Sequence, residues 1–103
     1  MAEKLRAALS RREPAIRDFY DTDHAVQRLG WDVLAPAFVA LVGRKLRMPG
    51  NAAVDVSAAR LAALRAQLDA ELKPVLRAAD FERFDLDRAF RTVAGVATAL
   101  GVG

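Results

Sequence analysis

The chain has 103 residues, 53% hydrophobic and 28% charged, which suits one folded domain rather than a disordered segment. It has no cysteine, so disulfides and cysteine-based zinc sites are excluded. The net charge of +3 comes from thirteen arginines and three lysines against thirteen acidic residues, typical of a mixed solvated surface. Without an apolar run of membrane-spanning length or the apolar centre of a signal peptide, we expect a cytoplasmic protein with no membrane partner.

Two helices are predicted in the first third of the chain, over residues 2–9 and 15–29. Pro14 separates them, because proline disfavours helical geometry in the residue before it and suits the first turn of the next helix. Gly30 is a usual helix-ending residue. The predicted apolar face of the second helix consists of Ile16, Phe19, Tyr20 and Val26.

Two carboxylates, Asp18 and Asp21, project from roughly the opposite side of this second helix. They could share a metal, or one could accept a proton from a substrate hydroxyl while the other orients a basic group. The alternative is a pair of exposed carboxylates that form ion pairs with nearby arginines. Asp23 falls within the apolar stripe, where it either pairs with an arginine of a neighbouring helix or marks the edge of the stripe.

The middle of the chain predicts a connector at 31–35, tucked against the body, and a third helix from Pro36 to about residue 47. Ser57 is a good N-cap for a fourth helix. Its leucines, spaced by three and four, are Leu61, Leu64, Leu68 and Leu72. They form a packing face too short to be a coiled coil.

Pro74 should kink or break the fourth helix, with residues 75–79 continuing at an angle. Asp80 is then expected to cap a short turn. Asp85 or Asp87 is expected to cap the last helix, which ends at Gly101.

These elements predict an all-α single domain over residues 1–103, an irregular antiparallel bundle of about five helices. The residues expected to be buried in it are Leu5, Ile16, Phe19, Phe38, Leu41, Val42, Leu61, Leu64, Leu68, Phe90 and Val93.

Residues 3–7, Glu-Lys-Leu-Arg-Ala, and residues 17–21, Arg-Asp-Phe-Tyr-Asp, resemble the AbiEii/AbiGii family of abortive-infection nucleotidyltransferase toxins. The helical run after them is similar to that family's C-terminal half. The resemblance implies a toxin–antitoxin protein that adds nucleotides to an acceptor such as transfer RNA. It also implies that Lys4 contacts the nucleotide, and that Asp18 or Asp21 assists the acceptor hydroxyl.

The family's site also needs a Gly-Ser nucleotide-binding turn and an Asp-x-Asp metal motif, which lie upstream of these helices. The sequence Asp21-Thr22-Asp23 spells the second motif, but helical neighbours two apart point about 200° away from each other and cannot grip one ion. We therefore expect the C-terminal helical portion of the enzyme, with the N-terminal half absent. Mg²⁺ and a nucleoside triphosphate are implied for the complete enzyme, whereas the isolated chain is expected to have no metal site, no cofactor and no activity.

The strongest local concentration of positive charge consists of Lys4, Arg6, Arg11, Arg12 and Arg17. On a shared face these side chains could contact a nucleotide or RNA phosphate. The alternative is an intramolecular network with Glu3, Glu13 and the carbonyls at a helix C-terminus.

A second hypothesis is a stand-alone helical interaction module that kept the fold and lost the enzyme. The expected partners are an antitoxin, the missing N-terminal half or a second copy of the chain, bound through an exposed apolar surface near the first two helices. DNA upstream of Met1 that encodes the Gly-Ser turn and the Asp-x-Asp motif would favour the enzyme.

Overall fold

The computed structural model describes residues 1–102, within which there are six α-helices and no strand. This confirms the prediction of an all-α fold. The elements in chain order are α1 (Ala2–Ser10), α2 (Ile16–Leu29), α3 (Pro36–Leu46), α4 (Ala58–Gln67), the π-helix η1 (Leu68–Leu72), the 3₁₀-helix η2 (Lys73–Val75), α5 (Ala78–Arg83) and α6 (Leu86–Leu100).

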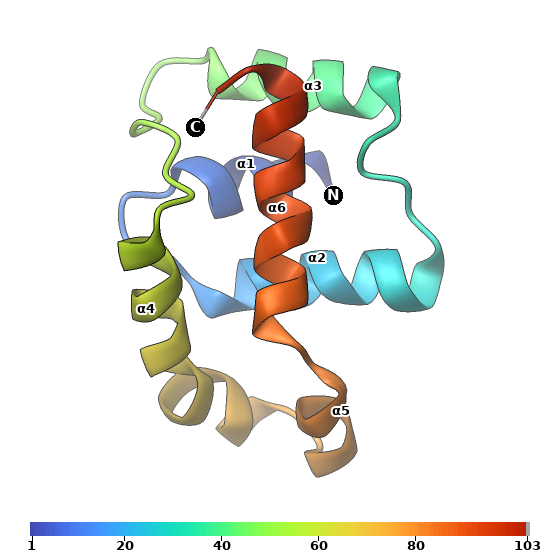
Figure 1. The fold of residues 1–103 in the computed structure, drawn as a ribbon, viewed down its shortest axis with the longest axis vertical. Helices are drawn as coiled ribbons and strands as arrows, with labels where there is room; N and C mark the ends of the chain where they lie inside the picture. The colour runs from blue at the N-terminus through green and yellow to red at the C-terminus, as the bar shows by residue number, and fades with distance from the viewer. Residues whose placement is uncertain (103) are drawn as a thin grey trace.

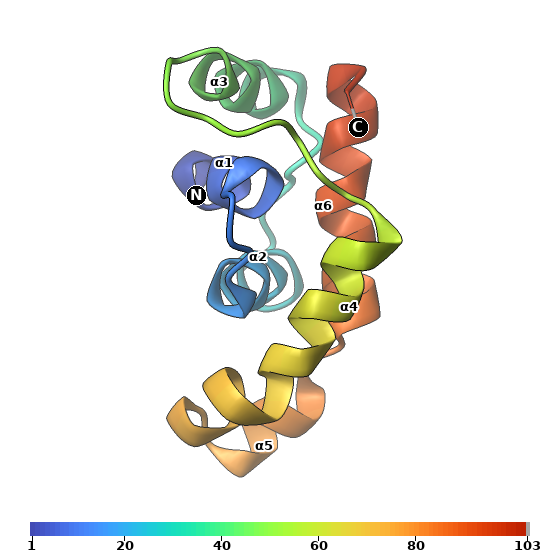
Figure 2. The same cartoon turned by 90° about the vertical axis from the view of Figure 1, so that its left-hand side faces the viewer.

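Three helices stack in one layer, in the order α3, α1, α2, so that α1 lies in the middle (Figure 2). Helices α1 and α2 run antiparallel, as their short linker requires, and α6 crosses the layer (Figure 1). Helix α4 leads away from this layer toward α5, which lies at the opposite end of the molecule from α3 (Figure 2). The first two helices, which carry the candidate site, are therefore held by neighbours on several sides.

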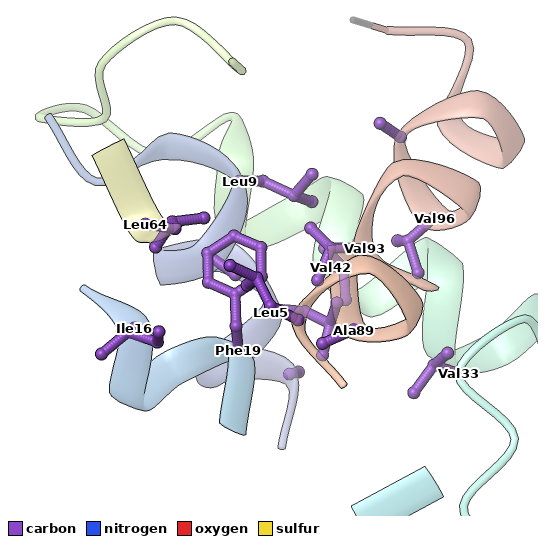
Figure 3. Close-up of a cluster of buried hydrophobic side chains, with 14 of the residues drawn as sticks. Leu5, Leu9, Ile16, Phe19, Val33, Val42, Leu64, Ala89, Val93 and Val96 are labelled. Atoms are coloured by element: carbon purple, nitrogen blue, oxygen red, sulfur yellow. The ribbon is translucent and has the colours of Figure 1, made fainter. Parts of the chain in front are cut away.

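The core lies where α6 crosses the three stacked helices. Leu5, Phe19 and Val93 are fully buried there, and Figure 3 shows their side chains converging from α1, α2 and α6. The ring of Phe19 stacks on that of Phe90 with centroids 6.0 Å apart. The apolar face predicted for α2 is thus the face that binds α6.

The core prediction is confirmed for Leu5, Ile16, Phe19, Val42, Leu64 and Val93. Another four of the expected residues are only partly buried and pack against the core, namely Phe38, Leu61, Leu68 and Phe90. The prediction that Leu41 is buried was wrong, because its side chain is 37% exposed. Helix α3 lies at the edge of the layer (Figure 2), so Val42 and Gly43 take its buried side and Leu41 faces outward.

Three predicted helix ends are confirmed in atomic detail. Gly30 follows α2 with a φ of 73°, a left-handed conformation that glycine adopts without a steric penalty. The Ser57 side chain accepts a hydrogen bond from the Arg60 amide, and the Asp85 side chain accepts one from the Arg88 amide. Side-chain acceptors thus satisfy free amides at the starts of α4 and α6.

The prediction for residues 75–79 was wrong. The chain turns extended at Leu76, with φ −111° and ψ 153°, and the half-buried Leu76 side chain packs against the core. Helix α5 begins only at Ala78, with Arg77 as its N-cap, and Asp80 lies inside its first turn rather than capping it.

The connector between α2 and α3 is also less buried than predicted. Val33 lies in the core, but Trp31 is 46% exposed and Leu34 is 55% exposed. The Trp31 ring makes an edge contact with Phe38 of α3, so it covers that helix from outside and keeps one face in solvent.

Candidate functional site

Lys4, Asp18 and Asp21 meet between α1 and α2. The Lys4 Nζ atom lies 2.9 Å from Asp21 Oδ2 and 3.7 Å from Asp18 Oδ1. Because α2 runs back along α1, residues that are 14 and 17 positions after Lys4 in the sequence return to its side chain. The structure thus brings together the three residues predicted to be catalytic.

Two arginines complete this ionic cluster. Arg11 Nε donates a hydrogen bond to Asp18 Oδ2 at 3.0 Å, and Arg17 Nε lies 3.5 Å from Asp21 Oδ1. Two carboxylates therefore lie among three cationic side chains, and the cluster has one positive charge left over when all five are ionised. That excess suits an anionic ligand.

The two carboxylates differ in their access to solvent. The side chain of Asp18 is 4% exposed, whereas Asp21 is 27% and Lys4 is 44% exposed. The helical pattern predicted only that both carboxylates lie on the face roughly opposite the apolar stripe. Asp18 is buried there between α1 and α2, so the alternative of an exposed pair does not hold for Asp18. Of the three residues predicted to be catalytic, Lys4 and Asp21 are the two that a ligand can reach, and Arg11 and Arg17 beside them are also open to solvent.

The pKa of Lys4 is raised, mainly by its hydrogen bond to Asp21 and further by the charges of Asp21 and Asp18, whereas desolvation and the charge of Arg17 oppose the rise. Lys4 consequently stays protonated throughout the neutral range. It can bind a phosphate oxygen as an ammonium, but it cannot serve as a general base there.

A divalent metal does not fit this cluster. Each oxygen of Asp18 and of Asp21 already faces a cationic nitrogen within 4 Å, and no group of three metal-ligating side chains occurs among residues 1–102. A Mg²⁺ ion here would have to displace Lys4 or an arginine, so no metal role is assigned to these residues.

The two other predicted phosphate contacts lie apart from this cluster. Arg6 binds Glu3 through Nε at 2.9 Å and reaches Asn51 Oδ1 at 3.2 Å, so it belongs to the intramolecular network considered as the alternative. Arg12 is exposed on the linker, and no ion pair within residues 1–102 involves it.

Helix α4 supplies two polar contacts to this region that sequence reasoning missed. Arg60 Nη2 donates to the Ala8 carbonyl, and Gln67 bonds both Pro14 and Ile16. The available signal was polar residues on the same helical face as Leu64. Asp23 is likewise a charged residue within an apolar helical stripe. Its predicted pairing with an arginine of another helix is confirmed, since Arg88 of α6 binds it at 2.7 and 2.9 Å.

Comparison with known protein families places this helical chain in the class of nucleotidyltransferase toxins. Residues 1–96 match the family described as "Nucleotidyl transferase AbiEii toxin, Type IV TA system". The match spans nearly the whole chain, so the protein belongs to the AbiEii family. A toxin family of this kind implies an antitoxin as partner.

Neither a curated protein nor a solved structure matches the chain significantly. Among residues 1–102, none of the helices has the length and apolar character needed to cross a membrane.

Proposed function

We propose that this chain forms the helical part of a nucleotidyltransferase active site. The observation that carries the proposal is the meeting of Lys4, Asp18 and Asp21 across α1 and α2, at contacts of 2.9 and 3.7 Å. Lys4 binds a phosphate of the nucleoside triphosphate, and Asp21 accepts a hydrogen bond or a proton from the acceptor hydroxyl. Transfer RNA is the acceptor class that family resemblance favours.

The difference in burial between the two aspartates separates their roles. Asp21 is the more accessible carboxylate and can touch a substrate, whereas Asp18 is buried and holds Lys4 and Arg11. An ammonium group has three N–H donors, so Lys4 can keep its contact with Asp21 and still donate to a phosphate. Asp18 is then a positioning residue rather than a catalytic one.

Nucleotidyl transfer also requires a divalent cation held against the triphosphate. Since the cluster does not fit such an ion, we propose that a separate polypeptide segment holds it, with the Asp-x-Asp motif expected for the family. The 103-residue chain by itself is then inactive, and positioning by both parts is needed for transfer.

A second candidate function, a helical interaction module, is supported by the exposed apolar side chains of Leu29, Trp31 and Leu34. They lie at the end of α2 and on the following connector, whereas the apolar side chains of α1 are buried. The apolar surface predicted near both of the first two helices is therefore confined to this end of α2. A protein partner or a second copy of the chain could cover it.

A direct test uses the DNA immediately upstream of the Met1 codon. If it encodes the Gly-Ser turn and the Asp-x-Asp motif, that segment is co-expressed with the chain, and incorporation of labelled nucleotide into total transfer RNA is measured. We expect incorporation from the combined parts, none from either part alone, and its loss on Lys4→Met. A stable complex without incorporation would favour the interaction module.

A further inference from the structure

Three side chains on one face of α4 are directed at the junction of α1 and α2. Arg60, Leu64 and Gln67 are spaced by four and three residues, the spacing that places side chains on the same side of a helix. Leu64 is fully buried in the core, and Arg60 is only 5% exposed. A guanidinium and an amide thus flank an apolar anchor on the inner face of this helix.

Arg60 holds the end of α1. Its Nη2 atom donates a hydrogen bond of 2.9 Å to the carbonyl of Ala8, which is in the last turn of that helix. A positive charge is favourable there because the carbonyls at a helix C-terminus carry partial negative charge. The position of α1, and hence of Lys4, is therefore tied to α4.

Gln67 holds the start of α2 and the linker before it. Its Nε2 donates to the Pro14 carbonyl at 2.7 Å, and its Oε1 accepts from the Ile16 amide at 2.8 Å. The N-cap residue Ala15 makes no side-chain cap, so Gln67 satisfies one of the amides that a helix start leaves free. The first turn of α2, which contains Asp18, is thereby fixed from α4.

The linker has one side-chain hydrogen bond, from Arg11 to Asp18, that connects it to α2. Its residues Arg11, Arg12 and Glu13 are all exposed, and neither α1 nor α2 has a side-chain cap at its N-terminus. The contact between Lys4 and Asp21 nevertheless requires a defined relation between the two helices, because one residue lies on each. Helix α4 makes side-chain hydrogen bonds on both sides of the linker, to the last turn of α1 through Arg60 and to the start of α2 through Gln67.

We propose that α4 is a brace for the hairpin of α1 and α2, and that Arg60 and Gln67 are positioning residues for Lys4, Asp18 and Asp21. The role of these residues in catalysis rests on the proposed function, but their effect on the geometry of the site can be tested without catalysis.

The burial of Arg60 is energetically costly. Its Nε has no hydrogen-bond partner within the described residues, and burial lowers its pKa.

Burying a charged group without a partner of opposite charge is costly, and methionine keeps most of the apolar length of the arginine side chain without that charge. Arg60→Met should therefore leave the unfolding temperature unchanged or higher while it loosens the candidate site. Gln67→Met removes both linker hydrogen bonds without changing charge. Gln27→Met, on the exposed side of α2, is the matched control.

The test measures the pKa of Lys4 by NMR titration of its side chain in the purified chain and in each variant. Thermal unfolding is followed by circular dichroism. In folded Arg60→Met and Gln67→Met, the raised pKa of Lys4 should fall toward the ordinary lysine value, because Asp21 moves away from the ammonium. Gln27→Met should keep it.

An unchanged Lys4 pKa in both folded variants would overturn the brace. Unfolding of both would also contradict it, since the contacts would then serve only stability. Nucleotide incorporation by the complete enzyme is measured separately. Arg60→Met and Gln67→Met, which misplace the site, should lower its rate on the order of 10²-fold. If the Lys4 pKa falls but incorporation does not, the brace stands and the proposed function fails.

Discussion

Lys4 Nζ lies 2.9 Å from Asp21 Oδ2, and this contact joins α1 to α2 beside a linker that has little packing of its own. An ion pair this exposed is worth only about 0–1 kcal/mol of stability. The core formed by Leu5 and Phe19 already holds the two helices together. The ion pair is therefore not needed to hold the two helices together.

The pH dependence of stability should reveal this pair. The folded-state pKa of Lys4 is raised, so its stabilising contribution is complete below the unfolded pKa and is lost as the pH rises through the folded pKa. Raising the pH above about 10 should therefore lower the free energy of unfolding of the wild-type chain more than that of Lys4→Met, as measured by urea unfolding. Parallel stability curves for the two proteins would show that Lys4 does not bind Asp21 in solution.

Leu64 should be far more sensitive to truncation than Leu41. Leu64 is fully buried in the core, whereas Leu41 is 37% exposed. Leu64→Ala is expected to cost about 2–5 kcal/mol of unfolding free energy, because it leaves a cavity in the core. Leu41→Ala, the matched control, should cost less than about 1 kcal/mol. Equal losses in urea unfolding would contradict the assigned orientation of α3 or α4.

The elements that sequence predicted well are those whose signals are local. Gly30, Ser57 and Asp85 end or begin helices through contacts within a few residues, so their types reveal their roles. The apolar face of α2 was likewise visible, because Phe19 and Ile16 recur at helical spacing. The all-α fold followed from such signals.

The errors and omissions concern contacts between distant segments. The outward face of Leu41 depends on α3 lying at the edge of the layer, and Leu76 turns extended because its side chain packs against the core. The meeting of Lys4 with one of the two aspartates of α2 was implied by the resemblance, but its contact with both and the burial of Asp18 were not predictable. Gln67 bonds Ile16 across 51 positions, and helical periodicity carries no information about such a contact.

Asp23 and Arg88 should be energetically coupled. Two hydrogen bonds join them, and the Asp23 side chain is 7% exposed, so Asp23→Asn should cost about 1.5–3 kcal/mol, the usual worth of a hydrogen bond to a charged group. A double-mutant cycle with Arg88→Met, measured by urea unfolding, should give a combined loss smaller than the sum. Strict additivity would mean that the pair does not join α2 to α6 in solution.

The central claim is that Asp21 belongs to a nucleotidyltransferase site, and the most direct measurement is labelled-nucleotide incorporation into transfer RNA by the complete enzyme carrying Asp21→Asn. Asp87→Asn is the matched control, because Asp87 is an exposed carboxylate on α6 that pairs with Arg65. We expect Asp21→Asn to lose about 10²–10⁴-fold in rate, Asp87→Asn to retain full activity, and the 103-residue chain alone to show none. Full activity of Asp21→Asn, or robust incorporation by the chain alone that Asp21→Ala abolishes, would contradict the account.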